Sequence, residues 1–132
     1  MKFFKAFVAG MILPAVIAPF LMAFLVLKGE GVALASLPFL YFGPLTWGLW
    51  NVLFFVTKQK VPINNRNHKI GIYGAVYGLI TALINTLGFE FTSKITILPE
   101  SMIFLSIVVY PVILYFAWKY VVNAANFIFD VY

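Results

Sequence analysis

The chain of 132 residues is 64% hydrophobic and only 10% charged, whereas soluble domains carry about 25% charged residues. A soluble fold of this size would expose apolar patches far larger than a monomer tolerates, so the composition excludes an ordinary soluble protein. The absence of cysteine also excludes disulfide scaffolds, thiolate metal sites and thiol catalysis. We predict an all-α integral membrane protein, because an open sheet in lipid would leave unpaired strand edges.

Four apolar runs predict four membrane-spanning helices, at residues 7–27, 32–56, 70–89 and 102–118. A helix of about 20 residues crosses the hydrocarbon core at 1.5 Å per residue. The last run is at the lower limit of this length, so we expect its helix to continue along the interface towards Phe129, with Lys119 snorkelling. Three short polar stretches separate the runs. We therefore predict one membrane domain over residues 1–132, with its four helices in a compact antiparallel bundle.

The basic residues predict the orientation. One side of the membrane would hold seven of the nine: Lys2, Lys5, Lys58, Lys60, Arg66, Lys69 and Lys119. The other side would hold Lys28 and Lys94, together with Glu30, Glu90 and Glu100. Because cytoplasmic loops carry the excess of Lys and Arg, we predict a multi-pass protein of the plasma (inner) membrane with both termini cytoplasmic. The net charge of +5 is then an orientation signal rather than a nucleic-acid-binding surface.

The four predicted spans contain no Asp, Glu, Lys, Arg or His. Ionisable groups inside a bilayer mark proton relays, ion coupling and voltage sensing. Haem and metal sites need ligands, and the single histidine, His68, lies in a polar loop without partners. We therefore predict no enzyme activity, no catalytic residue, no cofactor and no metal.

Neutral polar residues remain inside the predicted spans, namely Thr46, Asn51, Thr81, Asn85 and Ser106. One interpretation is a polar track between the second, third and fourth helices that binds or passes a small solute. The other is hydrogen bonding between helices, for which membrane proteins commonly use such side chains. We favour hydrogen bonding, because this number of neutral polar residues is ordinary for a bundle.

Small residues predict a close helix crossing. Gly74 and Gly78 form a GxxxG step that Ala82 extends by one turn, and missing side chains let two helix backbones approach. The first helix offers Gly10 and Ala18 at a matching spacing, so we expect it to be the partner. The alternative is a seam between two copies of the chain.

These observations leave two main functional hypotheses. The first is a non-catalytic accessory or interaction component whose partners are the lipid bilayer and a second membrane protein or a second copy. The alternative is a minimal oligomeric channel or transporter for a small solute, and lipid binding between the helices is a weaker third. The polar loop at residues 57–69 could hold anionic headgroups, although we interpret it as a solvated loop. No nucleic-acid partner is expected.

Overall fold

The computed structural model describes residues 1–31, 38–88 and 102–132, and over these residues the chain is helical, with no strand. This confirms the all-α fold class. The four helices include three that are long and apolar enough to cross a membrane, at Lys2–Leu27, Arg66–Leu87 and Leu105–Ile128. The start of the predicted span at residues 32–56 lies outside the described residues, and so does the end of the predicted span at residues 70–89.

The helices follow one another as two hairpins. In the first hairpin, α1 (Lys2–Leu27) packs along α3 (Pro38–Thr57). In the second, α4 (Arg66–Leu83), which continues into the π-helical segment η1 (Ile84–Gly88), packs against α6 (Met102–Phe116). The last helix continues from α6 through a π-helical segment, η2 (Ala117–Val122), into α7 (Asn123–Ile128).

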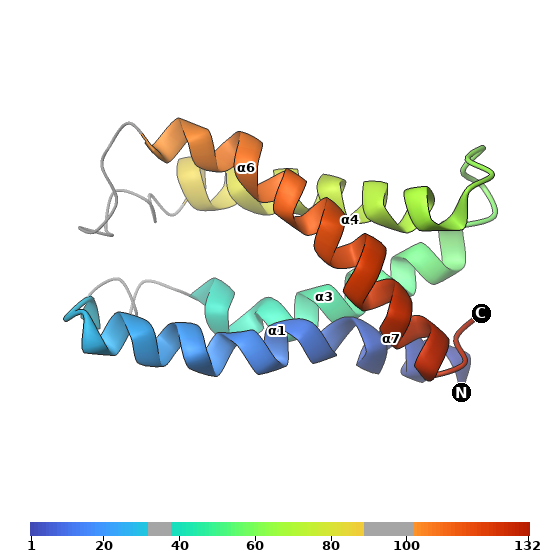
Figure 1. Ribbon diagram of the computed structural model, residues 1–132, viewed down its shortest axis with the longest axis horizontal. Coiled ribbons are helices and arrows are strands. Elements are labelled where there is room, and N and C mark those ends of the chain that lie inside the picture. Colours follow the sequence, from blue (N-terminus) through green and yellow to red (C-terminus); the bar gives the residue numbers. More distant parts are fainter. Residues whose placement is uncertain (32–37, 89–101) are drawn as a thin grey trace.

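The two hairpins meet at one end of the molecule and separate towards the other (Figure 1). Both termini and the α3–α4 connection at residues 58–65 lie at the end where the hairpins meet, which we call the basic end. There α7 crosses from the second hairpin onto α1. We call the opposite end, where α1 finishes, the far end.

Two helices finish in the same hydrogen-bond pattern. After α1, the Gly29 amide donates to Val26 and the Glu30 amide donates to Leu25, with Gly29 in the left-handed region at φ 76°. This is a Schellman motif, in which glycine avoids the steric cost of a positive φ. After α7, Asp130 occupies the equivalent position at φ 52°. The reversal at Asp130 turns the chain back, so Tyr132 lies against the basic end.

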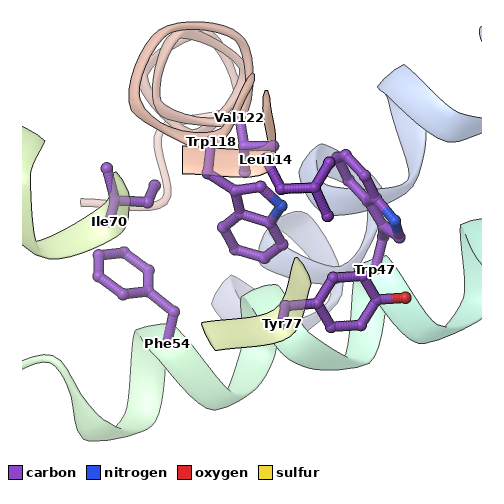
Figure 2. Packing of buried hydrophobic residues seen from close by; sticks show 7 residues of the cluster. All are labelled: Trp47, Phe54, Ile70, Tyr77, Leu114, Trp118 and Val122. Atoms are coloured by element: carbon purple, nitrogen blue, oxygen red, sulfur yellow. The ribbon is translucent and has the colours of Figure 1, made fainter. Parts of the chain in front are cut away.

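The hydrophobic core lies where the hairpins converge. Its main cluster contains Trp47, Phe54, Ile70, Tyr77, Leu114, Trp118 and Val122 (Figure 2). The Trp118 indole points from η2 towards α3, and its ring centroid is 5.7 Å from that of Trp47. A second cluster of Ala6, Ala9, Ala125 and Val131 joins α1 to α7 and the C-terminal residues. The π-helical segment η2 therefore delivers the largest buried side chain to the centre of the core.

The C-terminal helix runs past Lys119 to Ile128. The Tyr115 hydroxyl lies 2.7 Å from His68 Nδ1, and Asn123 Nδ2 donates to Asn67 Oδ1 at 2.9 Å. Lys119 lies between these two contacts along the helix, so it is level with the first turn of α4. Its ammonium lies over the rings of Tyr115 and Tyr120, 5.6 and 5.3 Å from their centroids.

Candidate functional site

A close helix crossing lies within the second hairpin. A Cβ added to Gly74 would lie 2.5 Å from the Leu114 carbonyl oxygen, and one added to Gly78 would lie 2.8 Å from Pro111 Cα. Ala82, one turn further along α4, is also buried. Gly74 and Gly78 therefore let the backbones of α4 and of the helix formed by α6 and η2 approach each other, so the crossing is internal to the chain.

The prediction that α1 would be the partner of these glycines is wrong. Gly10 of α1 instead faces α3, where an added Cβ would meet Asn51 Cβ at 2.7 Å and Gly48 Cα at 3.0 Å. Ala18 lines a groove described below. A four-residue spacing of small side chains occurs in both hairpins, and it carries no information about which helix lies opposite.

A buried amide pair joins three helices at the basic end. Asn51 Nδ2 donates to Asn126 Oδ1 at 2.7 Å, and Asn126 Nδ2 donates back to Asn51 Oδ1 at 3.0 Å. Asn51 Nδ2 also donates to the Ala6 carbonyl at 2.7 Å. Both asparagines are 0% exposed. The pair therefore ties α3 to α7 and to the backbone of α1.

A ladder of hydrogen bonds connects α3 to α4, whose backbones hardly approach each other. The Thr46 and Tyr77 hydroxyls lie 2.6 Å apart, as do the Thr57 and Tyr73 hydroxyls. Between these two pairs, Trp50 Nε1 donates to the Tyr73 carbonyl at 2.9 Å. Large side chains thus bridge the gap between the hairpins.

Of the remaining predicted polar residues, Thr81 lies one turn from Tyr77 and forms a side-chain hydrogen bond with Tyr110 of α6. Thr81 is buried and donates to its own helix, at Tyr77 O (2.9 Å) and Gly78 O (3.1 Å). Asn85 lies half-buried in η1, and Ser106 lies half-buried in α6. Asn51 belongs to the separate pair that faces α1 and α7.

Three polar partners, Asn126, Tyr73 and Tyr77, were not predicted from the sequence. Asn126 lies beyond the last predicted span, so its burial depends on α7 folding back over α1. The tyrosines carry a signal that could have been used, because a buried Tyr hydroxyl usually has a hydrogen-bond partner. Tyr73 and Tyr77 are also one turn apart, on the same face of α4.

Towards the far end, an apolar groove of about 260 Å³ lies between α1, α3 and α6. Its lining consists of Leu13, Pro14, Ile17, Ala18, Leu21, Gly43, Pro44, Trp47, Tyr110, Ile113, Leu114 and Ala117. None of the five predicted track residues is among them. The groove thus presents an almost wholly apolar surface between the two hairpins.

At the basic end, a second cavity of about 310 Å³ has a different lining. Three cationic side chains, two amides and two aromatic rings surround it, namely Lys58, Arg66, Lys69, Gln59, Asn64, Phe54 and Tyr132. We call this cavity the basic pocket.

Comparisons of the chain with protein-family models, with curated proteins and with solved structures find no match. The residues that the structure describes contain no group of three or more His, Asp or Glu residues that could hold a metal. A functional interpretation therefore depends on the groove, the basic pocket and the hydrogen bonds between the helices.

Proposed function

We propose that the chain is a multi-pass membrane protein that acts by interaction, and that its apolar groove receives a membrane-spanning helix of a partner protein. In this proposal the four helices cross the plasma (inner) membrane as one antiparallel bundle. The basic end faces the cytoplasm, as the distribution of Lys and Arg predicts. The proposal assigns no catalytic role to the chain.

The observation that carries this proposal is the lining of the groove. Small or ring-constrained residues from two hairpins meet there, including Ala18, Gly43 and Ala117, with Pro14 and Pro44 beside them. Such residues let another helix backbone come close, which is how helices associate where lipid supplies no hydrophobic drive. Exposed aliphatic side chains at the rim, such as Ile113, would provide the remaining contact area.

The hydrogen bonds support interaction over solute transport. The Thr46 hydroxyl is shared with Tyr77, the Asn51 amide with Asn126, and the Thr81 hydroxyl with its own helix. Groups paired in this way are not available to replace the hydration shell of a solute. A solute path would also need polar groups along a cavity, and the groove offers apolar ones.

Site-specific photo-crosslinking in native membranes tests the proposal. A benzoylphenylalanine at position 113 would lie in the groove, and one at position 112 supplies the control, because Ile113 and Val112 are 54% and 52% exposed but only Ile113 lines the groove. We expect one discrete protein adduct from position 113 and none from position 112.

A second pair of variants tests whether the groove itself is responsible. Ala18→Trp fills the groove and should abolish the adduct from position 113, whereas Ala15→Trp, on the exposed face of the same helix, should preserve it. Lipid adducts alone would contradict a partner helix. An adduct that survives Ala18→Trp, or one of twice the mass of the chain, would also contradict it.

A further inference from the structure

The basic pocket gathers positive charge around a concave surface. The Arg66 guanidinium lies 4.2 Å from the centroid of the Tyr132 ring, and Lys58 Nζ lies 5.1 Å from the same centroid. Lys69 Nζ donates to the Lys58 carbonyl at 2.7 Å, which fixes the lysine against the end of α3. Tyr132 is itself positioned, because its hydroxyl donates to Asn123 Oδ1 at 2.5 Å. The three cations are therefore held by an aromatic ring and by backbone.

No acidic side chain of the described lining neutralises the charge in the pocket. None of the described residues that line it is acidic. The nearby Asp130 carboxylate forms an ion pair with Lys5, whose Nζ lies 3.7 Å from Asp130 Oδ2. Burial, the Lys2 ammonium and the Arg66 guanidinium together hold the pKa of Lys58 below its ordinary value. The Arg66 guanidinium beside Lys58 would attract an anion directly, because opposite charges at short range stabilise each other.

The pocket lies at the level where the helices leave their apolar segments. Thr57 is the last residue of α3 and Arg66 is the first of α4. Phe54 provides an apolar wall one turn deeper, and Lys58, Gln59 and Asn64 provide polar groups outside it. An anion attached to an apolar chain would match this change from apolar to cationic lining.

We propose that the basic pocket binds a phosphate-bearing anion, presented as the headgroup of an anionic membrane lipid. Arg66 supplies a planar set of N–H donors suited to phosphate oxygens, and Lys58 and Lys69 supply compact positive charges. Asn64 and Gln59 offer amide donors to the remaining headgroup oxygens. Basic pockets between membrane helices on the cytoplasmic side are known to hold anionic headgroups. This proposal does not depend on the groove or on its partner.

Lipid titrations of the purified chain in detergent test the proposal. Dioleoyl phosphatidylglycerol should raise the thermal unfolding temperature and remain bound in native mass spectrometry, whereas dioleoyl phosphatidylcholine should do neither. Inorganic phosphate is the third arm. If phosphate alone reproduces the stabilisation, the anion is a soluble phosphate compound, and if only phosphatidylglycerol does so, it is a lipid. Either result supports the phosphate chemistry.

Matched variants locate the site. Arg66→Gln and Lys58→Gln should each weaken phosphatidylglycerol binding by about fivefold. Lys60→Gln removes the same charge from the same connection but lies outside the pocket lining, so binding should stay within about twofold. The unfolding temperature of each variant without lipid checks that it is folded. Equal stabilisation by both lipids, or equal weakening by Lys60→Gln and Lys58→Gln, would overturn the proposal.

Discussion

The basic end and the far end of the molecule are held together in different ways. At the basic end, α7 crosses onto α1, the Asn51–Asn126 pair links three helices, and Trp118 fills the space between the hairpins. Towards the far end, the hairpins separate around an apolar groove. The same four helices therefore form a closed half and an open half.

This difference follows from where the chain places its polar and large aromatic side chains. In the proposed topology the helices are surrounded by lipid, which is as apolar as their own surfaces. Association then depends on packing and on hydrogen bonds between helices. The asparagine pair supplies hydrogen bonds at the basic end, while the tyrosine ladder and the glycine crossing supply the hydrogen bonds and packing that hold α4 to α3 and to α6. The groove lining supplies neither between α1 and α6, so that surface remains open for the proposed partner helix.

The largest expected effect is on the activity of reporter proteins that show which end of the molecule faces the cytoplasm. A fluorescent reporter that matures only in the cytoplasm should be active when fused at Tyr132 or inserted between Lys58 and Lys69. It should be inactive when inserted after Lys94, because three predicted spans separate that segment from the cytoplasmic N-terminus and place it on the opposite side. An exported phosphatase reporter should give the reverse pattern. Phosphatase activity at Tyr132 would contradict four spans with a cytoplasmic N-terminus, and the proposed orientation with them.

Breaking the asparagine pair should destabilise the closed half. Asn51→Leu leaves the buried Asn126 amide without its partner, and an unsatisfied buried polar group costs about 1–3 kcal/mol. The loss should be seen as a lower unfolding temperature in detergent. The double variant Asn51→Leu, Asn126→Leu should recover part of this loss, since both polar groups are then removed. A double variant less stable than either single variant would show that the pair is not a unit.

Two glycines provide a direct comparison of the two halves. Gly74→Ala places a Cβ 2.5 Å from the Leu114 carbonyl, so it should cost about 1–3 kcal/mol by overpacking. Gly43→Ala makes the same change in the groove, where nothing lies within 4 Å of the added Cβ. It should be neutral or slightly stabilising, by up to about 1 kcal/mol of helix propensity. Denaturant titration checks both.

A variant at the glycine crossing also tests whether this contact lies within one chain or between two copies of the chain. Because the atoms that face Gly74 belong to the same chain, Gly74→Ala should leave the oligomeric mass unchanged in light scattering. A shift from dimer to monomer without loss of monomer stability would place the contact between copies instead.

Hydropathy was enough to predict the helical class and the approximate position of each helix, because a span of about 20 apolar residues is a property of local sequence. The extension of the last helix past Lys119 could also be anticipated from its short apolar run. The partner of Gly74 and Gly78 could not, since small residues at four-residue spacing occur on both α1 and α4. The depth and spacing of small residues predict that a close contact lies there, but they do not identify the helix on the opposite side.

The asparagine pair was unpredictable for a different reason. Asn51 and Asn126 are 75 residues apart in the chain, and Asn126 becomes buried only because α7 crosses the end of the first hairpin. That crossing depends on tertiary packing of Ala125 and Val131 against Ala6 and Ala9. A polar residue after a predicted span is equally consistent with a solvated tail, so sequence alone gives no reason to place it in the core.

The smallest expected effect concerns the ladder that bridges the hairpins. Thr46→Val removes the hydroxyl shared with Tyr77, and hydrogen bonds between membrane helices contribute about 0.6 kcal/mol on average. Thr57→Val removes the hydroxyl shared with Tyr73 at the last residue of α3, where water can replace it, so its cost should be smaller still.

A double-mutant cycle of Thr46→Val with Tyr77→Phe, followed by unfolding in detergent, isolates the first contact from the loss of each side chain. Measurable coupling at Thr46 with none at Thr57 would fit a ladder that strengthens away from the membrane surface. Equal coupling at both positions would indicate that water reaches neither hydroxyl. No coupling at either would leave packing and the Trp50–Tyr73 hydrogen bond to hold α3 beside α4.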